Sequence, residues 1–103
     1  GELVNIDARG NRVAMLCYGP KQVIVILGMN KLCPDLDSAI LRARELAAPP
    51  NATRLQRKTP CAVTGRCGDC FGPDSICSQF VITRRSGEKG RIQVILVGEE
   101  LGY

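Results

Sequence analysis

The first eighteen residues contain two apolar runs separated by a polar turn. Residues 3–6 alternate between apolar and polar side chains, the period of two expected of a strand with one buried face. Residues 8–11 include Arg, Gly and Asn, which favour a turn, and residues 13–18 return as a second apolar run. Two extended runs joined by a short turn predict a β-hairpin.

Residues 23–27, which read Val-Ile-Val-Ile-Leu, are apolar at every position rather than at every second one. This pattern is typical of a strand that is covered on both faces in a parallel sheet, so we expect this strand to be central. Residues 80–83 and 92–97 predict two further strands, separated by a glycine-rich turn at 86–90.

A helical period follows the expected central strand. Pro34 and Asp35 are start signals, and Pro49-Pro50 should end the helix because proline lacks the backbone N–H that helical hydrogen bonds need. Asn51 can then cap a short second helix over 52–56. The apolar positions of the first helix recur at steps of three and four: Leu36, Ala39, Ile40, Ala43, Leu46 and Ala47. Together these elements predict an α/β fold, a partial open sheet with a β-hairpin, central parallel strands and flanking helices.

Four of the six cysteines fall within the glycine-rich stretch 59–77: Cys61, Cys67, Cys70 and Cys77. Their spacing is C-x5-C-x2-C-x6-C, in which the central pair can bind one metal while the outer cysteines fold back to complete a tetrahedron. The stretch has no apolar period, so we expect a cysteine-rich loop held by local turns and by whatever the sulfurs bind.

Three interpretations of this loop remain open. The chain has no histidine, so a metal site here would be an all-thiolate zinc site or an iron-sulfur cluster. Only Cys67 and Cys70 have the C-x2-C spacing of a zinc knuckle, and the irregular outer spacings favour a [4Fe-4S] cluster over zinc. The third interpretation is a mobile loop with free or disulfide-bonded thiols and no metal. The other two cysteines, Cys17 and Cys33, have aliphatic neighbours and are expected to be small core residues.

The charge pattern adds little specificity. Fourteen basic and ten acidic residues give a net charge of +4, with basic residues on both sides of the cysteine loop. These form either a solvated surface or an electropositive surround for thiolates and anions. Aromatic residues make up only 4% of the chain, which argues against a nucleic-acid platform. With no apolar run of about 18 residues and no signal peptide, we expect a soluble protein in the reducing cytoplasm.

A second candidate site is the loop 28–31 after the expected central strand. Ligands of open α/β sheets bind beyond the carboxyl ends of the strands, where Asn30 and Lys31 could hold a phosphate or carboxylate. An ordinary strand-to-helix turn explains the same residues. Asp7, Asn11 and Arg12 could be turn residues or the rim of the same pocket. The chain offers no catalytic triad, phosphate loop or dinucleotide fingerprint.

Several stretches resemble the C-terminal part of a lactate-utilisation (LUD) domain protein of the cysteine-containing branch. They cover nearly the whole chain: residues 1–7, 10–14, 18–28, 30–31, 47–51, 58–65 and 91–103. The resemblance implies a fold similar to the sugar-phosphate isomerase and CoA-transferase superfamily, without its N-terminal helices and first strands. It also implies an association with lactate oxidation alongside iron-sulfur partner proteins, and it implies no set of catalytic residues.

We therefore expect residues 1–103 to be one domain, the C-terminal fragment of a LUD domain. Such a unit should expose apolar surface, so its covering partner would be the missing N-terminal segment or another copy, as in a homo-oligomer. Two functions fit this picture. One is a metal- or cluster-bearing redox or accessory component acting in lactate (2-hydroxy acid) utilisation, and the other is a zinc-stabilised binding or assembly module without catalysis.

Overall fold

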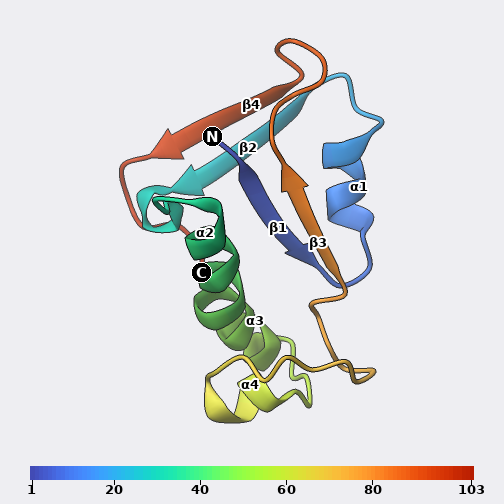
Figure 1. Ribbon diagram of the computed structural model, residues 1–103, viewed down its shortest axis with the longest axis vertical. Helices are drawn as coiled ribbons and strands as arrows, with labels where there is room; N and C mark the ends of the chain where they lie inside the picture. Colours follow the sequence, from blue (N-terminus) through green and yellow to red (C-terminus); the bar gives the residue numbers. More distant parts are fainter.

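The computed structural model describes all residues 1–103, and its four strands pair as two separate two-stranded sheets (Figure 1). Strand β1 (Leu3–Asp7) pairs with β3 (Gln79–Thr83) in antiparallel orientation. Strand β2 (Val23–Gly28) pairs with β4 (Ile92–Val97) in parallel orientation. Helices lie beside both sheets, which confirms the α/β class.

The first sheet replaces the expected hairpin. Leu3 is opposite Thr83 and Asp7 is opposite Gln79, so the partner of β1 comes from the other end of the chain. The segment predicted as the second hairpin strand forms helix α1 (Asn11–Cys17) instead. Its buried side chains, Val13 and Leu16, are three residues apart on one helix face. A short apolar run does not distinguish a strand from a helix by its period, and here the helix-favouring Arg, Ala, Met and Leu prevail.

The second sheet is parallel, as expected, but β2 is not central. Val23 aligns with Ile92 and Gly28 with Val97, and β4 is the only hydrogen-bonded neighbour of β2. Side chains along β2 alternate between half-buried and exposed, and Ile26 is 62% exposed. The continuous apolar run therefore has one face without a covering layer in this structure.

A single long helical segment connects the second sheet to the cysteine loop (Figure 1). After the short 3-10 turn η1 (Met29–Lys31), the helix begins with α2 (Leu36–Arg42), where Asp35 accepts a hydrogen bond from the Ser38 N–H at 2.7 Å. It continues through the π-helical turn η2 (Ala43–Ala47) into α3 (Ala48–Arg54).

The predicted break at Pro49-Pro50 is therefore wrong. In the π turn the N–H of Ala48 reaches back five residues to the carbonyl of Ala43, one residue further than in an α-helix. Pro49 and Pro50 then fall in the first turn of α3, where a backbone N–H has no helical partner to lose. The separate second helix that Asn51 was expected to cap is absent, because Asn51 lies within α3.

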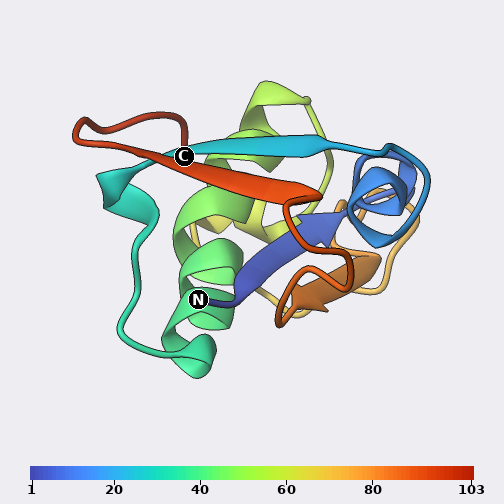
Figure 2. The ribbon, with the colours of Figure 1, turned by 90° about the horizontal axis from the view of Figure 1, so that it is seen from above.

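A small core lies under the cysteine loop. Ala52 of α3, Cys61 of helix α4 (Pro60–Thr64) and Ile76 are buried together, and Ala8, Ala62 and Cys77 pack against them. The loop is thus held by apolar contacts and by a short helix, which the sequence pattern did not indicate. The two sheets lie at different levels, with β1 beside the long helix (Figure 2).

Little of the chain is buried. Nine of 103 residues are buried, and the accessible surface is 7330 Å². A compact monomer of 11.1 kDa is expected to expose about 5,700 Å². None of the helices has the length and apolar character needed to cross a membrane.

Candidate functional site

The cysteine loop begins at helix α4, whose ends are fixed by local chemistry. Thr59 caps the start by accepting a hydrogen bond from the Ala62 N–H at 3.4 Å, and Pro60 occupies the first turn. Gly65 ends the helix with a φ of 75°, a left-handed conformation that favours glycine. Cys61 is buried on this helix, and its sulfur is 3.3 Å from the Thr59 hydroxyl.

The other three cysteines of the loop gather beside Cys61. All are free thiols, and Cys67, Cys70 and Cys77 are each half-buried. Burial raises the pKa of Cys77, and the negative charges of Cys67, Cys61 and Cys70 raise it further. The four sulfurs are therefore close enough to act on one another electrostatically, although the chain separates the outer two by sixteen positions.

Two side chains of the π turn reach the middle of the loop. An Nη2 of Arg44 donates to the sulfur of Cys67 at 3.3 Å and to Oδ1 of Asp69 at 2.7 Å. Glu45 accepts a hydrogen bond from the backbone N–H of Cys67 at 3.1 Å. The hydrogen bond with Cys67 is the main cause that raises the pKa of Arg44.

The loop also contains a strained residue. Asp69, between Cys67 and Cys70, has a φ of 48°, a left-handed conformation that non-glycine residues adopt uncommonly. Further along, the carboxylate of Asp74 accepts a hydrogen bond from the Lys58 N–H at 2.7 Å, which ties the two ends of the loop together. The loop is thus ordered by polar contacts at its middle and at its base.

The thiols do not form a ready site for a single metal ion. No three His, Cys, Asp or Glu side chains are arranged as ligands of one ion. Four sulfurs on zinc at about 2.3 Å would lie about 3.8 Å from one another, so zinc would require the loop to contract. The donor set itself, four free thiols on an accessible loop, suits a thiolate-bound cluster.

The two remaining cysteines lie outside this group. Cys17 is the last residue of α1 and is exposed, so the expectation that it is a core residue is wrong. The error follows from the strand assignment, because as a helix the segment turns Val13 and Leu16 inward instead. Cys33 is half-buried, and its thiol lies 3.8 Å from the carbonyl of Lys31.

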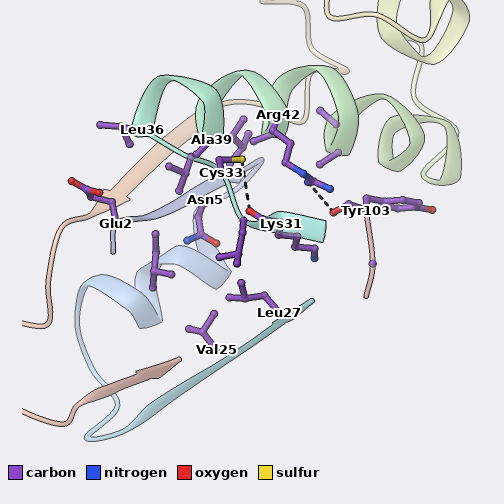
Figure 3. Close-up of a pocket in the computed structure, with 18 of the residues that line it drawn as sticks. Glu2, Asn5, Val25, Leu27, Lys31, Cys33, Leu36, Ala39, Arg42 and Tyr103 are labelled. Carbon is purple, nitrogen blue, oxygen red and sulfur yellow. Dashed lines mark hydrogen bonds between the residues drawn. The ribbon is translucent and has the colours of Figure 1, made fainter. Parts of the chain in front are cut away.

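The second candidate site lies at the edge of a large cavity. This cavity, of about 850 Å³, is lined by residues of β1, β2, β4 and the long helix, and Lys31 and Arg42 are among them (Figure 3). The amide of Asn30 is occupied by the chain itself, because it accepts from the Leu101 N–H at 3.1 Å and donates to the Gly102 carbonyl at 3.3 Å. Arg42 donates to the carbonyls of Asn30 and Tyr103. Asn30 thus anchors the C-terminal segment, and its role with Lys31 in anion binding stays a prediction.

The hairpin residues separate into two kinds. Arg12 lines the same cavity as Lys31 and donates to the carbonyl of Ile6 at 3.0 Å. Asp7 is a turn residue, since its Oδ1 accepts from the N–H groups of Arg9 and Gly10, both at 3.0 Å. Asn11 begins α1 and does not line the cavity.

Comparison with known proteins gives one match. The family model of the LUD domain matches residues 1–97. The chain belongs to the LUD-domain family. This family is related to lactate utilisation, in agreement with the resemblance found in the sequence. No curated protein and no solved structure matches the LUD domain described above.

Arg44 and Glu45 are site residues that the sequence did not reveal. They precede Cys67 by more than twenty positions and sit in a segment that reads as an ordinary amphipathic helix. The one available signal is Pro49-Pro50, because a helix that continues into two prolines must rearrange its preceding turn. That rearranged turn is the one that carries both residues.

Proposed function

We propose that Cys61, Cys67, Cys70 and Cys77 hold one [4Fe-4S] cluster, and that this LUD domain is a redox or accessory component linked to the utilisation of lactate or a similar 2-hydroxy acid. The observation that carries the proposal is the gathering of four free thiols whose charges act on Cys77. A bound cluster would supply one-electron transfer. The chain's own residues bind it, shield it and balance its charge.

The arrangement of the thiols favours a cluster over zinc. A cubane cluster holds its ligand sulfurs further apart than a single ion does, and no three of these thiols are arranged for one ion. The small core of Ala52, Cys61 and Ile76 shields one side of the thiols from water. The opposite side remains accessible, which allows the metal and an electron-transfer partner to approach.

The charges around the loop also suit a negatively charged cluster. Residues 46–68 contain four basic residues and no acidic one: Arg54, Arg57, Lys58 and Arg66. Positive charge near thiolates favours their ionised form, which is the form that binds metal. The same charge attracts anionic substrates and partners. Free thiols of this kind persist in the reducing cytoplasm, where we place the protein.

The decisive test of the ligand set uses single cysteine variants purified without oxygen. Cys67→Ser and Cys70→Ser should lose most of the bound iron and acid-labile sulfide, because each removes one of the four ligands. Cys17→Ser is the matched control, since Cys17 is exposed and outside the group, and it should keep the wild-type content. Full iron occupancy in both loop variants would refute the four-cysteine site. Stoichiometric zinc without sulfide would support an assembly module instead.

We further propose that another polypeptide segment covers the apolar surface, either from the same protein or from a second copy. Ile24 and Ile26 on β2, and Val94 and Leu96 on β4, are about half exposed. Two-stranded sheets are marginal alone in water, and these two have no covering layer on those side chains. The cavity between the sheets and the long helix offers the segment a place to pack.

A further inference from the structure

We propose that Arg44 is a positioning residue for the thiolate centre, and that its hydrogen bond to the Cys67 sulfur raises the reduction potential of the loaded centre. This inference rests on the proposed function. It adds a residue outside the cysteine loop and a property, the potential, that the ligand set alone does not determine. Hydrogen bonds to cluster sulfurs are among the main determinants of such potentials.

The first step of the argument is the helix that carries Arg44. Pro49 and Pro50 do not permit a regular α-helix through this segment, and the π turn Ala43–Ala47 accommodates them. Such single π turns are frequent at functional sites, because the extra residue changes where the side chains of that turn point. Here the turn directs two adjacent residues, Arg44 and Glu45, to the same residue of the loop.

The second step is the pattern of contacts at Cys67. Arg44 approaches the sulfur, while Glu45 holds the backbone N–H of the same residue. Asp69 fixes the other side of the guanidinium at 2.7 Å and does so from a left-handed backbone conformation. A non-glycine residue persists in that conformation when its surroundings hold it there. The sulfur, the backbone and the next charged residue of the loop are thus all set by the same turn.

The third step separates this role from simple stabilisation. The side chain of Asp69 is 76% exposed, and such surface ion pairs contribute only about 0–1 kcal/mol to folding. A donor on a ligand sulfur acts differently, because it favours whichever state of the centre carries more negative charge. Reduction adds one electron and no atom to the centre. The guanidinium therefore favours the reduced state, and its removal should lower the potential.

The test measures the potential of the whole chain, purified without oxygen, by spectroelectrochemical titration. Arg44→Gln removes the charge and the donor fork, and its potential should shift to more negative values. Arg44→Lys keeps the charge without the planar fork and should give a smaller shift in the same direction. Arg54→Gln is the matched control. Arg54 lies on the same helix and its guanidinium contacts only the Asn51 side chain, so its potential should equal that of the wild type.

Each outcome decides between the claims. A cluster of unchanged potential in Arg44→Gln would overturn the role of Arg44 and leave the proposed function standing. An equal shift in Arg54→Gln would also overturn it, because the effect would then be one of general charge. If Arg44→Gln fails to assemble a cluster, the Arg44→Lys measurement decides by the same criterion. Absence of iron and sulfide from the wild type would overturn the proposed function and this inference with it.

Discussion

Asp7 fixes the turn between β1 and α1 at the scale of a single residue. It is buried, accepts two backbone hydrogen bonds, and lies 3.6 Å from the guanidinium of Arg12. Asp7→Ala should lower the free energy of unfolding by about 2 kcal/mol, since hydrogen bonds to a charged group are lost. Urea denaturation measures the change. Glu100→Ala, at an exposed position, is the control and should change stability by less than about 0.5 kcal/mol.

The same residue gives a dependence on pH. Burial alone would raise the pKa of Asp7, but the N–H groups of Gly10 and Arg9 and the charge of Arg12 outweigh it and lower the pKa below its ordinary 3.8. A lowered pKa in the folded state contributes stability above the unfolded value, which is lost as pH falls through the folded value. Asp7→Asn should therefore reduce the loss of stability below about pH 4. An identical acid transition in the variant would contradict this.

At this scale the sequence was informative about chemistry and silent about partners. The four clustered cysteines stood out because their spacing is compact and local. Their contact with Arg44 depends on how a distant helix lies, which no local spacing records. Asn30 was selected as an anion-binding residue for its place after a strand, yet its amide contacts the backbone of the C-terminal segment.

At the scale of elements, the long helix connects stability with the site. Replacing Pro49 and Pro50 together by alanine would allow a regular α-helix, and Ala is more favourable than Pro in a helix interior by about 3 kcal/mol. The double variant should be more stable than the wild type. It should also realign Arg44 and Glu45 and so release the middle of the cysteine loop.

Hydrogen exchange measures both effects of the proline replacement. Amides of α3 should become better protected, whereas the amide of Cys67, now without Glu45, should exchange faster. Pro73→Ala is the control because Pro73 is exposed and outside the helices. Unchanged exchange at Cys67 in the double variant would show that the π turn does not position the loop.

Elements were predicted well where the pattern was long and capped. Asp35 marks a helix start that the structure confirms, and the strands at 79–83 and 92–97 lie within one residue of the predicted ranges. The short segment 11–17 was assigned wrongly because its apolar run fits either a strand or a helix. The pairing of β1 with β3 could not be predicted either, since it joins residues more than seventy positions apart.

At the scale of the whole molecule, the exposed surface is the main feature. It exceeds the surface expected of a compact monomer by about 1,600 Å², twice the roughly 800 Å² that each partner buries in a standard interface. The radius of gyration of 14.1 Å is likewise above the roughly 12.8 Å expected for a domain of this length. A covering segment accounts for both values.

Sedimentation measures whether a second copy provides that cover. The 103-residue chain should self-associate at micromolar concentration, and Ile26→Asp should weaken the association, because it places a charge in the exposed apolar face of β2. Lys89→Asp, on the exposed turn between β3 and β4, is the control for added negative charge. A monomer at all concentrations would exclude a second copy as the covering partner.

The central claim is that the four cysteines of the loop hold one cluster, and the most direct measurement is iron, zinc and acid-labile sulfide analysis of protein purified without oxygen, together with its visible spectrum. We predict about four iron and four sulfide per chain and an absorption that dithionite bleaches. One zinc without sulfide, or neither metal, would contradict the claim.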